Sequence, residues 1–265
     1  QMRASKQTKS PPWSPSCPST AIRAQRGAVR QGGGVSDQHA MFPAVCIERG
    51  DGLTWLREHR AEPHTSIVTS LPDVSELALG FDAWQQWFSD AASQLLGWLP
   101  EGSVAIFYQS DILHAGVWID KGQLVQRAAA AAQASLVWHK IVCRTPPGEA
   151  RFGRASYSHL LCFSRGVLPP PRHAYPDVLP SDGSKTWTRG MGTAACELAC
   201  RYLRQETSTQ RVLDPFCGAG TIAIEAAQIA TYEARLAEAR EAEVEEAEAK
   251  EAEAGRAEAK PVEVQ

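Results

Sequence analysis

The middle of the chain alternates between two hydrophobic patterns. Short apolar runs bounded by glycine, proline or polar residues predict buried strands, and longer segments with apolar residues at helical spacing predict amphipathic helices. The expected strands cover 44–48, 66–69, 103–108, 135–143, 156–163 and 211–214, and the expected helices cover 53–59, 81–99, 122–134, 191–203 and 221–229. This alternation predicts an α/β fold with a mainly parallel sheet, in which 156–163 runs antiparallel.

The two ends of the chain differ from this pattern. The first 36 residues contain six basic residues and no acidic one, with little apolar surface to offset the entropy of ordering. We therefore predict a disordered basic tail or an organelle transit peptide over residues 1–40 and one folded domain over 41–231. Residues 232–265 are rich in alanine and glutamate but carry no apolar stripe, which predicts a solvated helical or disordered tail.

Composition excludes several classes of protein. No apolar run approaches the ~18 residues of a membrane span. The seven cysteines contain no CxxC pair, so we expect reduced thiols in an intracellular protein and no metal site. The expected compartment is the cytoplasm, or a plastid or mitochondrion if the first residues are a transit peptide. The net charge of -3 argues against a wholly basic nucleic-acid binder but permits a local basic face.

The strongest chemical signal is the segment VLDPFCGAGT at 212–221, in which a predicted strand ends in Asp214 and a glycine turn leads into a helix. Two glycines let the backbone pass close to a ligand at a helix N-terminus, and the preceding carboxylate suits a ligand with an ammonium group. The segment resembles the DPFxGxGT motif of the amino-methyltransferases that modify DNA and RNA bases with S-adenosyl-L-methionine (SAM). The resemblance implies a Rossmann-like fold, SAM as cofactor, and cofactor contacts from Asp214, Pro215, Phe216, Gly218, Gly220 and Thr221.

A second segment, Ser70-Leu71-Pro72-Asp73, follows a predicted strand and resembles the (D/N/S)PP(Y/F/W) motif of the same family. In that family, the first side chain and the next carbonyl orient the target amine. Here Leu71 replaces a proline, and Asp73 replaces the aromatic residue that stacks on the base. The resemblance implies that Ser70 and the Leu71 carbonyl orient the amine, that Pro72 stiffens the loop, and that Asp73 reads the base or accepts a proton. The alternative is a simple turn at a strand end.

The order of the two motifs is also informative, because the Ser70 segment precedes the Asp214 segment. This order is similar to that of circularly permuted amino-methyltransferases, in which a lysine-containing segment and a helix lead into DPFxGxGT. Lys185 is therefore a candidate cofactor contact, and Arg189 a candidate contact to cofactor or phosphate. The same resemblance places Asp51 near the adenine of SAM. A solvated loop at 185–189 and a common Gly-Asp turn at 50–51 are the alternatives.

One expected part of the family pattern is missing. After the helix that follows the glycine turn, the family continues with a strand ending in an acid that holds the ribose. Here the sequence runs directly into the alanine and glutamate tract. We therefore expect either a cofactor pocket without this clamp or a chain truncated at its C-terminus.

The sequence hence predicts a SAM-dependent methyltransferase acting on an exocyclic amine of a nucleic-acid base, with RNA favoured over DNA. Arg144, Arg154 and Arg189 are candidate nucleic-acid contacts, since arginines can hold a phosphate backbone. A catalytically inactive methyltransferase-fold scaffold or RNA-binding subunit is the main alternative. Methyl transfer to a protein or small-molecule amine is a second alternative.

Overall fold

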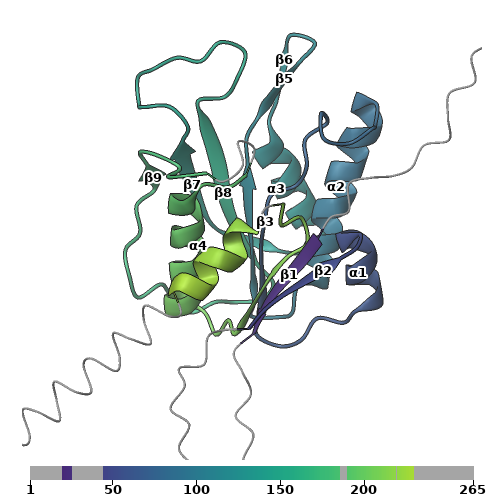
Figure 1. The fold of residues 1–265 in the computed structure, drawn as a ribbon, viewed down its shortest axis with the longest axis vertical. Coiled ribbons are helices and arrows are strands. Elements are labelled where there is room, and N and C mark those ends of the chain that lie inside the picture. The colour runs from purple at the N-terminus through teal and green to yellow at the C-terminus, as the bar shows by residue number, and fades with distance from the viewer. Residues whose placement is uncertain (1–19, 26–43, 186–189, 219, 230–265) are drawn as a thin grey trace, which may run out of the picture.

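The computed structural model describes residues 20–25, 44–185, 190–218 and 220–229. Its centre is an eight-stranded sheet in the order β2-β1-β10-β3-β4-β8-β7-β9 (Figure 1). The strands of this sheet are β1 (Thr20–Gln25), β2 (Ala44–Arg49), β3 (Thr65–Thr69), β4 (Val104–Gln109), β7 (Ser135–Cys143), β8 (Tyr157–Ser164), β9 (Val178–Leu179) and β10 (Arg211–Asp214). A separate hairpin, β5 (Ile112–His114) and β6 (Val117–Ile119), projects from the edge at which β4 ends.

The central strands β10, β3 and β4 are parallel neighbours, and β8 runs antiparallel to both β4 and β7. This arrangement confirms the predicted α/β fold with a mainly parallel sheet and an antiparallel strand at 156–163. Both β3 and β4 are buried along their whole length, as expected for strands covered on two faces. Because parallel strands end at the same edge, the residues that follow β10, β3 and β4 lie along one rim of the sheet.

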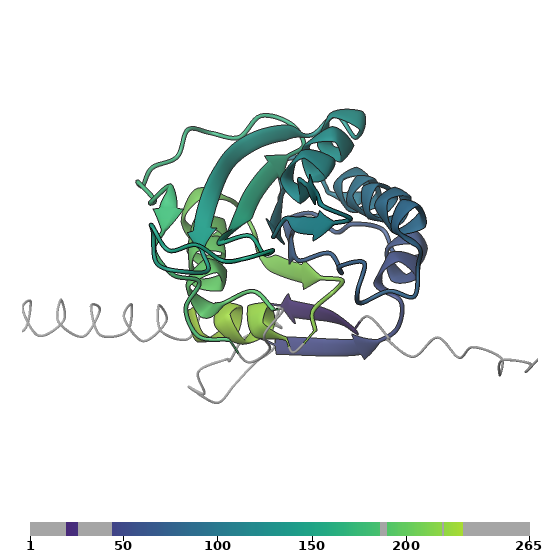
Figure 2. The ribbon, with the colours of Figure 1, turned by 90° about the horizontal axis from the view of Figure 1, so that it is seen from above.

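Helices cover both faces of the sheet (Figure 2). The helices are α1 (Gly52–Glu58), α2 (Phe81–Trp98), α3 (Lys121–Ala131) and α4 (Thr193–Glu206), and residues 221–229 are also helical. One hydrophobic cluster joins α1, α2 and α3 to the sheet through fully buried residues such as Trp84 and Phe88. A second cluster joins α4 and Ile222 to the opposite face.

The structure differs from the sequence-based prediction at Thr20–Gln25. This segment was expected to be disordered, but it forms β1, which pairs antiparallel with β2 and with β10. Composition reports how much apolar surface a segment can bury, but it does not report backbone hydrogen bonds offered by the edge of a distant sheet. The other parts of the predicted tails, and both predicted domain boundaries, lie outside the described residues.

Smaller differences have local causes. The helix expected over 122–134 ends at Ala131, because Gln133 takes a left-handed conformation with a φ of 55°. The β5–β6 hairpin and the short β9 were not predicted, since each strand has only two or three residues. Within the described residues, no helix is both long enough and apolar enough to cross a membrane.

Candidate functional site

The two sequence motifs meet at the rim of the sheet, although they are far apart along the chain. The hydroxyl of Thr69, the last residue of β3, donates to Oδ1 of Asp214, the last residue of β10, at 2.6 Å. Both side chains are buried. This contact places the loop of residues 70–73, called the Ser70 loop below, beside the turn that follows Asp214.

Asp214 is a buried carboxylate with spare hydrogen-bonding capacity. The backbone N–H of Phe216 also donates to Oδ1, at 3.1 Å, so both hydrogen bonds from described residues end on the same oxygen. Burial raises the pKa of Asp214 to about 7, and the bonds from Thr69 and Phe216 only partly oppose that effect. The second carboxylate oxygen, Oδ2, accepts no hydrogen bond from the described residues. A buried carboxylate of this kind fits a ligand that carries a positive charge, such as an ammonium group.

The glycine turn after Asp214 leaves room for such a ligand. Gly218 and Gly220 have φ values of 51° and 78°, a region that favours glycine. A Cβ added at Gly218 would meet no atom within 4 Å, so the turn is open at this point. The N–H of Gly220 donates to the carbonyl of Cys217 at 2.8 Å, and the helix over 221–229 begins immediately afterwards. The predicted contact residue Thr221 thus starts a helix whose N-terminal N–H groups can face a polar ligand.

The start of α1 packs directly against this turn. Asp51 is the N-cap of α1, and its Oδ1 accepts a hydrogen bond from the N–H of Thr54 at 2.7 Å. The next residue, Gly52, lies so close to Pro215 that an added Cβ would collide with the Pro215 carbonyl oxygen. Asp51 therefore lies next to the Asp214 turn, and its side chain caps α1.

Replacing Gly52 by alanine is expected to destabilise the protein by ~1–3 kcal/mol, because the new methyl group must displace the Asp214 turn. Chemical denaturation measures this change in the free energy of unfolding. Gly97→Ala in α2 is the matched control: a Cβ there meets nothing within 4 Å, so helix propensity should stabilise the protein by up to ~1 kcal/mol. Equal effects at the two positions would contradict the packing argument.

The Ser70 loop is held at several points. Leu71 is buried in the core. The carbonyl of Pro72 accepts a hydrogen bond from Nε1 of Trp84 at 3.1 Å, and Oδ1 of Asp73 lies 2.5 Å from Nζ of Lys121. Ser70 is half-buried, and its hydroxyl has no hydrogen-bond partner among the described residues. The Ser70 hydroxyl is therefore free to bind a ligand, whereas the Asp73 carboxylate already pairs with a lysine.

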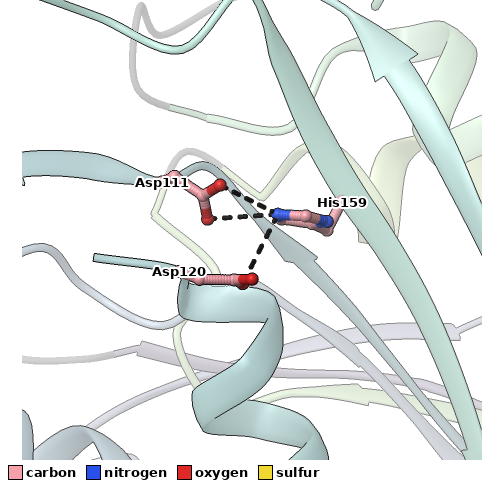
Figure 3. Close-up of side chains that lie close together, drawn as sticks. All are labelled: Asp111, Asp120 and His159. Carbon is pink, nitrogen blue, oxygen red and sulfur yellow. Dashed lines mark hydrogen bonds and ion pairs between the residues drawn. The ribbon is translucent and has the colours of Figure 1, made fainter. Parts of the chain in front are cut away.

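Sequence reasoning missed Lys121 and the polar cluster beside it. Nε2 of His159 lies 3.1 Å from Oδ1 and 3.2 Å from Oδ2 of Asp111, and 3.8 Å from Oδ1 of Asp120 (Figure 3). Nδ1 of His159 lies 2.9 Å from Nε2 of His139. No spacing in the sequence signals this cluster, because its members come from β8, β7 and the two ends of the β5–β6 hairpin.

The pKa values of Asp111 and His139 are both lowered, but for different reasons. Burial acts to raise the pKa of Asp111, but the hydrogen bond and charge of His159, with the N–H of Lys121, hold that pKa below its ordinary value. Burial and the neighbouring His159 lower the pKa of His139. Asp111 is therefore ionised and His139 neutral near pH 7.

The remaining predicted residues lie in different settings. Nζ of Lys185 pairs with Oδ2 of Asp182 at 2.6 Å and lies 5.9 Å from the centre of the Tyr108 ring, near the end of β4. Arg189 lies outside the described residues. Arg144 is half-buried and Arg154 is exposed, and both lie in the segment that joins β7 to β8.

Comparisons with known proteins agree with this architecture. The chain is similar to a candidate DNA modification methylase from Thermus thermophilus, with 18% identity and a TM-score of 0.52 over 68% of this chain and 82% of that one. A structure of the same protein with S-adenosyl-L-methionine matches at 16% identity and a TM-score of 0.51, over 68% of this chain and 83% of that chain. The cytosine-N4-specific PvuII DNA methyltransferase matches at 15% identity and a TM-score of 0.52, over 68% of this chain and 76% of that chain.

The chain thus has the Rossmann-like fold of the class I methyltransferases. A family model, the RMKL-like methyltransferase domain (UPF0020), matches residues 196–262, which include most of α4 and the Asp214 turn. A search of curated proteins finds no match. The fold thus agrees with the resemblance carried by the motif at 212–221, and the family model matches only part of the chain.

Proposed function

We propose that this protein transfers a methyl group from SAM to an exocyclic amine of a nucleic-acid base, and that the base belongs to RNA. The observation that carries the proposal is the hydrogen bond between Thr69 and Asp214. It joins the segment that resembles a cofactor-binding motif to the segment that resembles a target-amine motif. The order of the segments, on adjacent parallel strands, also supports a circularly permuted member of the amino-methyltransferases.

The residues at the rim suit each part of this reaction. SAM, when bound, supplies an electrophilic methyl group on a sulfonium. Asp214 holds the ammonium group of the cofactor through the carboxylate oxygen that the protein leaves free. The hydroxyl of Ser70 and the carbonyl of Leu71 accept hydrogen bonds from the target amine and turn its lone pair towards the methyl group. Catalysis then depends mainly on positioning two bound groups, which can account for several orders of magnitude in rate.

A nucleic-acid substrate is supported by the surface near the site. The segment that joins β7 to β8 carries Arg144, Arg151 and Arg154, which suit phosphate groups. It leads into Tyr157, whose hydroxyl donates to Oδ2 of Asp111 at 3.5 Å, so this segment ends beside the base of the β5–β6 hairpin. The similar solved structures are DNA methylases and do not distinguish RNA from DNA, so the choice of RNA is the part of the proposal that the following experiment decides.

Transfer of a tritium-labelled methyl group from SAM to total RNA tests this proposal. We expect label in RNA that ribonuclease releases, with much less label in genomic DNA under the same conditions. Label that deoxyribonuclease releases would show that the substrate is DNA. Label that only a protease releases would indicate a protein amine, and label that gel filtration separates from all macromolecules would indicate a small-molecule amine. If calorimetry shows SAM binding but no transfer occurs to any of these, the protein is a binding scaffold and the proposed activity is wrong.

A further inference from the structure

A buried lysine outside both motifs lies against the Ser70 loop. Lys121 is the first residue of α3, and only 4% of its side chain is exposed. Its Nζ lies 2.5 Å from Oδ1 of Asp73 and 5.9 Å from the centre of the Phe88 ring. Within the described part of the chain, Asp73 is the carboxylate that pairs with this ammonium group. Since a buried charge is stable only when it is paired, the Lys121 side chain and the Ser70 loop constrain each other.

Lys121 is itself held firmly in place. Its backbone N–H donates to Oδ1 of Asp111 at 2.9 Å, and Asp111 is held in turn by His159 (Figure 3). Asp120 caps α3, because its Oδ1 accepts a hydrogen bond from the N–H of Gln123 at 2.7 Å. The start of α3 is thus fixed by two carboxylates that flank the β5–β6 hairpin, and this fixes the point from which the Lys121 side chain extends.

The Ser70 loop is therefore anchored on both sides of the groups that would orient the amine. Before the loop, Thr69 is bonded to Asp214. At its far end, Asp73 is paired with Lys121, and about a third of the Asp73 side chain remains exposed. A movement of Asp73 would move the preceding carbonyl groups with it, because the loop has only four residues.

We propose that Lys121 is a positioning residue, whose ion pair with Asp73 sets where Ser70 and the Leu71 carbonyl stand relative to the methyl donor. This inference rests on the proposed function. It also assigns a role to the unusual carboxylate at position 73, where related amino-methylases carry an aromatic residue. Asp73 anchors the loop, and it does not read the base.

Hydrogen exchange tests the anchoring without any substrate. Lys121→Met removes the charge but keeps a long apolar chain against Phe88, and we expect amides within residues 71–76 to exchange at least ~10-fold faster than in the wild type. Lys140→Met is the matched control. Lys140 is also buried and pairs with Asp177 at 3.1 Å, but it lies on β7, so exchange within 71–76 should not change.

Kinetics and cofactor binding test the effect on the reaction. For Lys121→Met we expect kcat for methyl transfer to fall by ~10–100-fold, because a small misplacement of a reacting group has a large cost. The Kd for SAM should stay within about twofold, since the Asp214 turn is not touched. Adding Asp73→Asn to Lys121→Met should cause little further loss, because the two residues act as one pair.

The outcomes separate the inference from the proposed function. The positioning role would be overturned if amide exchange within residues 71–76 stayed unchanged in Lys121→Met, or if it accelerated equally in Lys140→Met. Loss of methyl transfer in Lys121→Met without faster exchange in the loop would also overturn it. Additive losses in the double variant would also contradict it. If Lys121→Met loosens the loop while the wild type transfers no methyl group to any nucleic acid, the anchoring role stands and the proposed function fails.

Discussion

Asp214→Ala is expected to weaken SAM binding by at least ~100-fold, measured by calorimetry. The carboxylate is buried, so its ion pair with an ammonium group would be shielded from water, and removing one partner of such a pair costs about 3–5 kcal/mol. Glu225→Ala provides a control, since this acid lies in the helix over 221–229 that follows the same turn but comes after the Asp214 motif. Retention of SAM affinity in Asp214→Ala would contradict the proposed cofactor site.

The same carboxyl predicts how SAM affinity depends on pH. Because the pKa of Asp214 is raised to about 7, the group is largely protonated in the free protein at pH 5 to 6, and an ammonium ligand requires the ionised form. The apparent affinity should therefore rise by up to about tenfold per pH unit until about pH 7, and then level off. In Asp214→Asn this rise should disappear. A flat profile in the wild type would show that ionisation of Asp214 does not limit binding.

Stability of the free protein should change in the opposite direction. The folded pKa is raised, so the unfolded chain loses its proton from about pH 4 while the folded protein keeps it until about pH 7. Folding is therefore disfavoured progressively across this interval, by at most roughly 4 kcal/mol for a rise from 3.8 to about 7. Asp214→Asn should then unfold at a higher denaturant concentration than the wild type at pH 8. It would combine higher stability with lost SAM binding, which separates a binding defect from a folding defect.

The sequence predicted the central architecture well, because that part of the chain obeys local rules. Strand 211–214 and strand 135–143 were predicted with their observed bounds. Each is a run of residues suited to strands, and a turn or a charged residue marks its end. The turn conformation at Gly218 and Gly220 was predictable because glycine adopts the positive φ angles found at these two positions more readily than other residues.

The features that the sequence did not predict depend on contacts between distant segments of the chain. The ion pair between Lys121 and Asp73 joins the start of a helix to a loop 48 positions earlier. No pattern of residues in the sequence predicts this pair. For the same reason the sequence suggested that Asp73 reads the base or accepts a proton, but gave no sign that its carboxylate pairs with Lys121. The strand at Thr20–Gln25 was missed because its hydrogen bonds come from β10, near the other end of the described chain.

Ser70→Ala is expected to reduce kcat for methyl transfer by about 100-fold while leaving the Kd for SAM within about twofold. The hydroxyl has no partner among the described residues, so its removal leaves no unpaired protein group and should hardly affect stability. The loss falls on the transition state, where the amine gains positive charge and its N–H groups bond more strongly to the serine oxygen. Methyl transfer at saturating SAM measures this effect.

The matched control for this prediction is Ser110→Ala. Ser110 is another half-buried serine, located just after β4 on the same rim, but its hydroxyl lies 2.5 Å from that of Ser158 and is already engaged. Its replacement should leave kcat within about twofold, whereas the stability of the protein should fall by ~1 kcal/mol as that hydrogen bond is lost. If the two serine variants lost the same activity, the rim as a whole would be fragile, and Ser70 would have no particular role in orienting an amine. A selective loss at Ser70 would instead tie the reaction to the Ser70 hydroxyl, which follows the Thr69 residue bonded to Asp214 and has no hydrogen-bond partner among the described residues.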